Sequence, residues 1–243
     1  MTAITLTATQ LRDLITPVIP HASKDQTLPS LCAVRIRSAG QYVTAIATDR
    51  YRIGFQRVTL TEPPAEGGGF DAAVPVAVLK RIMGVFRPTR WHNPVLELAV
   101  DGERLRVSLA DTMTEQTVGT SGDVDGLAGA SLTFALHSGD FPYPALDRLV
   151  REALEGVPDE AAMTAVFNPE FLADFRIGQP RHEPMRITAT GGPARPWLIR
   201  VGDDFIGLLV PVRYGDHTTV PEDTPSWLGL LDVPAEAEKP AAA

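Results

Sequence analysis

Hydrophobic and polar positions alternate along the chain with two different periods. Residues 4–7 alternate as a half-buried strand does. From Ala8 to Pro20 apolar side chains recur every three or four positions, which predicts a helix that the proline ends. Three more alternating stretches, separated by turn residues such as Gly40, predict strands. These strands are expected at 31–37, 42–48 and 52–60.

The same order of elements recurs twice further along the chain. A strand at 70–74 leads into a helix that begins at Pro75, and three strands follow. A third copy begins with a strand at 163–167, followed by a helix with Asn168 as its N-cap. Three copies of one strand–helix–strands unit favour a pseudo-symmetric α+β assembly over a fold with a single active site. The remaining strands are expected at 95–100, 104–109, 114–120, 185–190, 197–201 and 204–212.

Two stretches do not repeat this unit. Residues 121–162 offer only one strand, at 132–137, and one helix, at 145–154. After Tyr214 the chain is rich in proline, alanine and glutamate, which predicts a disordered tail. Within that tail, residues 226–232 form a short apolar cluster that would need a surface to bury it.

The composition is that of a globular protein, with 44% hydrophobic and 21% charged residues. The net charge of −8 is concentrated in residues 215–243, which hold six acids and one lysine. The rest of the chain is nearly neutral, and all but two of its basic residues are arginines. Arginine suits planar contacts to phosphate, so these side chains form either a basic face or a scattered set of solubilising groups.

The chain has no apolar run near the ~20 residues that cross a membrane, and its start lacks a secretory signal pattern. With a single cysteine, Cys32, it has neither an internal disulfide nor a cysteine-based zinc site. We therefore expect a cytoplasmic protein that does not contact membranes.

Sequence patterns typical of catalysis are missing. The glycines at 67–69 are not followed by the lysine of a phosphate-binding loop, and no serine has the setting of a nucleophile elbow. The five histidines are widely spread, without the paired spacing of metal ligands. We expect a protein that is not an enzyme and needs no cofactor or metal.

Four segments together resemble the bacterial sliding clamp family, the beta subunit of the replicative DNA polymerase. Residues 45–53 (AIATDRYRI) are similar to the family's ATDGHRL strand and turn, and residues 74–82 (VPVAVLKRI) to its VPxKxLxEL helix start. Residues 138–144 (SGDFPYP) resemble its interdomain segment. Residues 166–174 (VFNPEFLAD) and 208–213 (LLVPVR) are similar to its last helix and its terminal MPMR or MPVR.

The resemblance implies a DNA-clamp fold, with antiparallel sheets outside and helices lining a channel. Residues 1–122 resemble the family's middle domain, and residues 123–214 a shortened C-terminal domain; residues 215–243 would be the tail. Arg50 and Tyr51 stand where the family has Gly and His.

In such a clamp, basic and polar side chains on the inner helices meet phosphates of double-stranded DNA without reading its bases. The corresponding residues are expected to be Arg12, Lys24, Gln26, Lys80, Arg81, Arg148, Arg151 and Arg176. Each of these side chains can also be read as part of a solvated helix face.

The family also binds short linear peptides of its partners in an apolar cleft. The matching positions here are Leu28, Thr48, Arg50, Tyr51, Arg52, Ile53, Val210, Pro211, Val212 and Arg213. The alternative is that Ile53 and the valines are only strand core. The tail cluster at 226–232 is similar to such peptides, so it either competes for this pocket, packs as an extension, or docks another protein.

Three functions follow from these patterns. The first is a DNA sliding clamp or processivity factor that self-associates into a ring and docks a DNA polymerase and a clamp loader. The second is a clamp-derived adaptor or decoy that keeps the peptide pocket without encircling DNA. The third, a hydrolase on an unrelated scaffold, lacks the residues for its chemistry.

Overall fold

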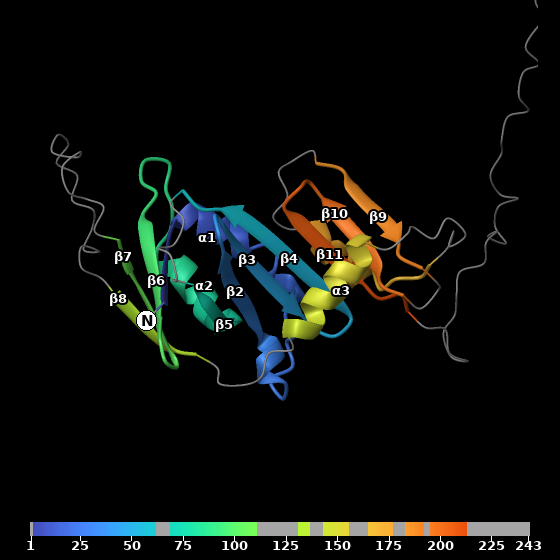
Figure 1. Cartoon of the computed structure of the whole chain (residues 1–243), viewed down its shortest axis with the longest axis horizontal. Coiled ribbons are helices and arrows are strands. Elements are labelled where there is room, and N and C mark those ends of the chain that lie inside the picture. The colour runs from blue at the N-terminus through green and yellow to red at the C-terminus, as the bar shows by residue number, and fades with distance from the viewer. Residues whose placement is uncertain are drawn as a thin grey trace, which may run out of the picture.

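Two antiparallel sheets and four short α-helices make up the described part of the molecule (Figure 1). The computed structural model describes residues 2–61, 69–110, 131–136, 143–155, 165–176, 183–191 and 195–212. Along the chain, the first strand belongs to the smaller sheet and the next four to the larger one. The following three strands belong to the smaller sheet, and the last three belong to the larger sheet.

The smaller sheet has four strands in the order β1-β6-β7-β8. Helix α1 follows β1 directly and begins with a capping box, in which Thr7 and Gln10 each accept a hydrogen bond from the other's backbone N–H. A second helix, α2, follows a strand of the larger sheet. The bounds are β1 Thr2–Thr7, α1 Ala8–Ile15, α2 Val76–Val85, β6 Val95–Asp101, β7 Arg104–Leu109 and β8 Ser131–Ala135.

The larger sheet has seven strands in the order β5-β2-β3-β4-β11-β10-β9. Its centre is the pairing of β4 with β11, which joins an early and a late part of the chain. We call this strand pair the seam. The bounds are β2 Ala33–Ala39, β3 Tyr42–Thr48, β4 Arg52–Thr59, β5 Asp71–Pro75, β9 Met185–Ala189, β10 Trp197–Val201 and β11 Phe205–Leu209.

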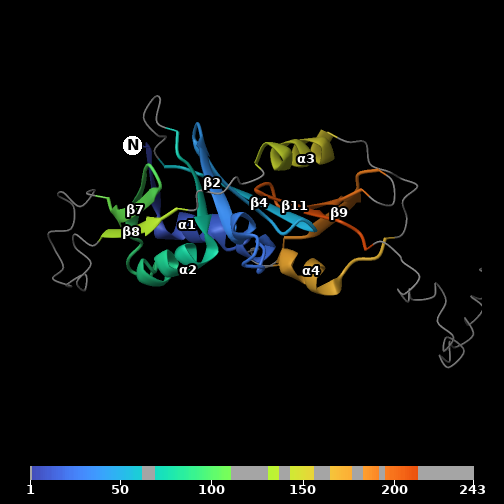
Figure 2. The same cartoon turned by 90° about the horizontal axis from the view of Figure 1, so that it is seen from below.

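The two faces of the seven-stranded sheet carry different helices, as Figure 2 shows. One face is covered by α1, α2, α4 (Pro169–Ala173) and the 3₁₀ turn η3 (Asp174–Arg176); we call it the helical face. The other face is covered by α3 (Tyr143–Glu155). The alternation of side chains along strands explains this division, because Ala45 and Ala47 join the core of α1 and α2 whereas Ile46, between them, packs with α3.

Most predicted elements are confirmed, with small shifts at their ends. The first helix ends at Ile15 because residues 19–21 form a separate 3₁₀ turn, η1. The strand expected at 31–37 begins at Ala33, since Pro29–Cys32 forms another 3₁₀ turn, η2. The strand expected at 163–167 is wrong in its described part: residues 165–167 are not in a strand, and Val166 only accepts one backbone hydrogen bond, from Val212.

The strand expected at 132–137 forms β8, which pairs with β7 in the smaller sheet. It therefore packs with elements of the proposed 1–122 domain; the division into domains at 122 and 214 stays a proposal. The strand expected at 114–120, the tail at 215–243 and its cluster at 226–232 lie outside the described residues. Within the described residues, no helix has the length and apolar character that crossing a membrane requires.

Candidate functional site

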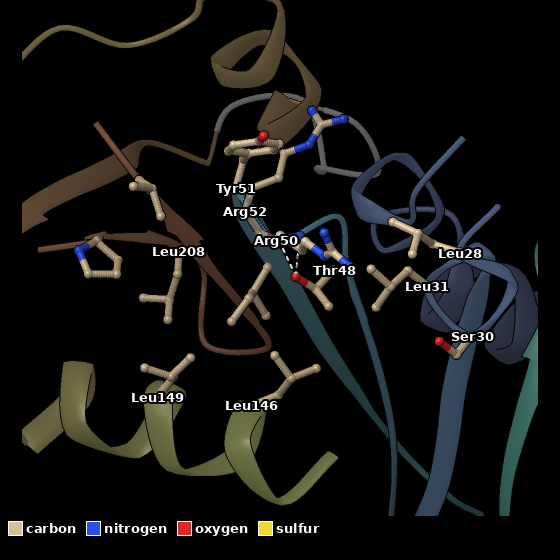
Figure 3. A pocket seen from close by; sticks show the side chains of 13 residues that line it. Leu28, Ser30, Leu31, Thr48, Arg50, Tyr51, Arg52, Leu146, Leu149 and Leu208 are labelled. Atoms are coloured by element: carbon tan, nitrogen blue, oxygen red, sulfur yellow. Dashed lines mark hydrogen bonds between the residues drawn. The ribbon is translucent and has the colours of Figure 1, made fainter. Parts of the chain in front are cut away.

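A pocket of about 410 Å³ opens where the seam meets α3 and η2. Its floor is formed by strand side chains, and Leu146 and Leu149 point toward Leu208 from α3 (Figure 3). The lining is mostly apolar, with Arg50 and Tyr51 from the turn between β3 and β4 and Arg52 from the start of β4. The lining residues are Leu28, Ser30, Leu31, Thr48, Arg50, Tyr51, Arg52, Ile53, Leu146, Leu149, Pro196, Leu208 and Val210.

The β3–β4 turn is held by its own side chains. The Thr48 hydroxyl donates to the Arg52 carbonyl (2.8 Å) and accepts from the Arg50 N–H (3.1 Å). Asp49 accepts from the backbone N–H groups of Tyr51 and Arg52. Arg50 has a φ of +80°, in the left-handed region that costs a residue with a Cβ about 1 kcal/mol or more. A glycine would adopt this conformation without that cost.

Arg52 is a buried anchor of the seam, with 4% of its surface exposed. Its Nε donates to Asp49 (2.9 Å), its Nη1 to Asp174 of η3, and its Nη2 to the Pro20 carbonyl (2.9 Å). The guanidinium also lies 4.4 Å from the ring centroid of Phe171. One cation thus ties together the turn, η1 and the last helix, so it has a structural role at the pocket wall.

On the opposite side of the seam, two glycines face each other in register, Gly54 in β4 and Gly207 in β11. A Cβ on Gly54 would lie 2.2 Å from the His21 ring, and one on Gly207 would lie 2.3 Å from the Phe175 ring. The two rings contact each other with centroids 4.5 Å apart. The absence of side chains on the strands therefore makes the space that these rings fill.

His21 is fully buried, and within the described part of the chain neither of its ring nitrogens has a hydrogen-bond partner. Burial, and then the charge of Arg52, lower the pKa of His21 to about 3, while Asp174 opposes them. His21 is therefore neutral at physiological pH and acts as an aromatic spacer beneath the pocket.

Seven of the ten predicted pocket residues line this pocket: Leu28, Thr48, Arg50, Tyr51, Arg52, Ile53 and Val210. Pro211 and Val212 follow the last strand without lining the pocket, and Arg213 lies outside the described residues. Arg52 is buried and ion-paired, so replacing it would disturb the fold as well as the pocket wall.

Sequence reasoning missed the wall formed by α3. Leu146 and Leu149 come from the helix expected at 145–154, and the sequence pattern does not indicate which face of a sheet that helix covers. Leu31 and Leu208 were assigned to strands, and their place in the pocket depends on the pairing of β4 with β11.

The predicted DNA-contacting residues fall on two faces of the sheet. On the helical face, Arg12 lies on α1, Lys80 and Arg81 on α2, and Arg176 on η3, all exposed. Arg148 and Arg151 lie on α3 and are exposed on the opposite face, so these two do not share a surface with the other four. The cause is that α3 packs on Ile46, Ile53 and Leu208, away from the other helices.

Lys24 and Gln26 are exposed in the connection between η1 and η2, on either side of Asp25. The Thr27 hydroxyl and backbone N–H both donate to Asp25, which lowers the pKa of that carboxyl. Asp25 therefore stays ionised and reduces the positive potential beside Lys24.

Comparison with known proteins gives one consistent result. The chain is 29% identical over 153 residues to the beta sliding clamp of Micrococcus luteus, a match that covers 61% of this chain and 41% of that protein. None of the protein-family models compared with the chain matches it. Among solved structures, the DNA polymerase III beta chain of Streptococcus pneumoniae superposes with a TM-score of 0.63 at 18% identity, covering 88% of this chain and 65% of that one. The beta subunit of Thermotoga maritima gives 0.63 at 14% identity, with 88% and 66% covered.

The antiparallel sheets and the helical face thus define a DNA-clamp fold of the α+β class. The predicted resemblance to the bacterial beta sliding clamp family is confirmed, over part of the length of those proteins. The chain spans less than half of its curated relative and about two thirds of each solved clamp chain.

Proposed function

We propose that this protein is a non-catalytic DNA sliding clamp of the cytoplasm that holds replication proteins on double-stranded DNA. The observation that carries the proposal is the pocket at the seam, which combines an apolar floor with an arginine and tyrosine rim. Such a lining suits a short peptide with leucine or phenylalanine anchors, because buried apolar anchors supply most of the affinity in interfaces of this kind. A DNA polymerase and a clamp loader are the partners we propose for it.

The pocket and the helical face lie on opposite sides of the seven-stranded sheet, which supports simultaneous binding of peptide and DNA. On the helical face, the basic side chains are Arg12, Lys80, Arg81 and Arg176. Their contacts to phosphates would be independent of base sequence and would weaken as salt rises. Self-association into a ring would place several such faces around one duplex.

The pocket is tested with two leucines of α3. Leu149 lines the pocket, whereas Leu154 is exposed on the same helix outside it. A fluorescently labelled peptide with leucine and phenylalanine anchors should lose about thirtyfold or more in affinity for Leu149→Glu, and less than twofold for Leu154→Glu. Equal binding by both variants would place the peptide site elsewhere.

The DNA face is tested with two basic residues of similar exposure. Lys80→Gln on the helical face should weaken duplex binding and reduce its salt dependence, because one phosphate contact is lost. Arg148→Gln, on α3, should leave both unchanged. If the Arg148 variant is the weaker binder, DNA lies against the other face.

Encirclement is tested by topology. A closed ring should be retained on circular DNA and slide from the ends of the same DNA once it is linearised, and its mass in solution should be a multiple of 26.2 kDa. Equal retention on both forms, with peptide binding intact, would favour the adaptor.

A further inference from the structure

The largest exposed aromatic side chain in the described residues is not part of the pocket. Trp91 has 87% of its surface exposed and lies in the turn after α2, at residues 87–93, which we call the Trp91 turn. An indole left in water at this degree of exposure is a large apolar surface without a partner. The rest of the turn indicates what such a partner is.

The Trp91 turn is held rigidly by hydrogen bonds. The Thr89 N–H donates to the His92 carbonyl (2.7 Å), and the Thr89 hydroxyl accepts from the N–H groups of Trp91 (3.3 Å) and His92 (3.0 Å). Asn93 accepts from the Thr9 N–H at the start of α1 (3.0 Å). The indole is therefore presented on a fixed support, which lowers the entropy that binding would cost.

The ionisable side chains in and around the Trp91 turn are all basic. Residues 86–94 contain Arg87, Arg90 and His92 and no acid. The Arg90 guanidinium lies 5.0 Å from the Trp91 ring centroid, and neither Arg87 nor Arg90 forms an ion pair with any carboxylate that the structure describes. An indole with one arginine beside it and a second in the same turn combines phosphate attraction with a flat stacking surface.

The turn continues the basic surface of the helical face. It begins just after α2, which carries Lys80 and Arg81, and it is hydrogen-bonded to the start of α1, which carries Arg12. A strand that follows phosphate contacts along these helices would reach the Trp91 turn at their end.

We propose that the Trp91 turn binds single-stranded DNA by stacking an unpaired base on the indole, with Arg87 and Arg90 contacting the flanking phosphates. Unpaired bases expose their flat faces, whereas bases within a duplex are already stacked on each other. This contact goes beyond the proposed duplex binding and rests on it only in bringing DNA to this side of the molecule. The clamp would thereby recognise a junction, with duplex on the helices and a single strand on the turn.

The test compares two labelled DNAs, a dT20 strand and a blunt duplex, by fluorescence anisotropy at a fixed salt concentration. Trp91→Ala should weaken dT20 binding about tenfold, within the range found when one base–aromatic stack is removed, and leave duplex binding within twofold. Trp91→Phe should retain most of the affinity. The control is Ile187→Ala, which removes another exposed apolar side chain, on β9, and should change neither DNA affinity.

A second readout uses the indole itself. In a chain with Trp197→Phe and Trp227→Phe, Trp91 is the only tryptophan, and stacking on a base should quench its fluorescence when dT20 is added. Unchanged dT20 affinity in Trp91→Ala, or no quenching, would overturn the proposal. An equal loss for strand and duplex would also overturn it. Lys80→Gln separates the two hypotheses, since its duplex defect would persist if only the stacking proposal fails.

Discussion

At one end of the seven-stranded sheet, β2, β3 and β5 share a continuous core with α1, α2 and the smaller sheet. At the other end, β9–β11 bury a few side chains against Phe175 and share the rest of their packing with α3. The first region has its own two-layer core, whereas the second completes its sheet only by pairing with β4. The pocket therefore forms only when the two regions pack against each other, because its walls come from both of them.

The largest effect should come from adding a side chain at the seam, where the Phe175 ring lies against β11. Gly207→Ala would place a Cβ 2.3 Å from the Phe175 ring, so the ring and the last helix must shift. We expect the free energy of unfolding to fall by about 3 kcal/mol, a cost typical of overpacking, and peptide binding to fall with it. Gly84→Ala in α2 meets open space and should raise stability by up to ~1 kcal/mol. Equal denaturant midpoints for the two variants would show that the seam tolerates side chains.

The next effect concerns the ion pair that crosses the seam. Asp174→Asn removes the partner that Arg52 has in η3 while leaving Asp49 in place. A buried cation with one carboxylate fewer should cost about 2 kcal/mol. The control is Asp204→Asn, whose pair with Arg57 also joins β11 to β4 but is exposed, and which should cost well under ~1 kcal/mol. Urea unfolding of both variants measures the difference; a larger loss for Asp204→Asn would contradict the anchor role of Arg52.

Acid should also destabilise the packing at the seam, because it favours protonation of His21. Its pKa is about 3 in the folded protein against an ordinary value of 6.5, so the unfolded chain binds the proton more readily. The contribution of neutral His21 is complete above pH 6.5 and is lost as the pH falls from 6.5 toward 3. Lowering the pH to 5.5 should cost about 1 kcal/mol, and the Arg52 charge beside the ring adds to the penalty while Asp174 reduces it.

The control for this pH dependence is His21→Leu, which cannot take up the proton. Thermal unfolding at pH 7.5 and 5.5 should show a smaller change for the variant than for the unaltered chain. Parallel pH profiles would mean that His21 is not the group that senses acid.

The smallest effect should be a gain in stability. Arg50→Gly relieves the left-handed φ of +80° and should raise the free energy of unfolding by about 1 kcal/mol. The relief is local to the β3–β4 turn, so α3 and the rest of the pocket should be undisturbed. Calorimetry checks the stability, and a decrease would show that the Arg50 side chain contributes more than its backbone costs.

The sequence predicts a structural feature well when the interactions that produce the feature are local in the chain. The periodicity of apolar residues predicts β3, β7 and β10 to the residue, because strand alternation and flanking turns are local signals. The family resemblance also leads to the β3–β4 turn of the pocket. Pairing between β4 and β11 is not local, so neither Leu208 as a pocket residue nor the opposed glycines can be found by periodicity alone.

The helix α3 shows the same limit in another way. Its amphipathic spacing predicts a helix. The face of the sheet that such a helix covers, however, depends on where the apolar side chains of the strands point. Ile46 and Ile53 direct it to the face opposite α1, and this placed Arg148 and Arg151 away from the other predicted DNA contacts.

The seam also determines when the pocket forms during synthesis of the chain. Arg57 and Asp204 meet across it although 147 residues separate them in the chain, and contacts of such long range form late in folding. During synthesis the N-terminal region folds first, leaving β4 as an open edge and Arg52 without Asp174. A ribosome-bound or prematurely terminated chain would have the helices α1 and α2 but not the finished pocket. Partners that bind through the pocket would then be recruited only by molecules whose synthesis has reached β11.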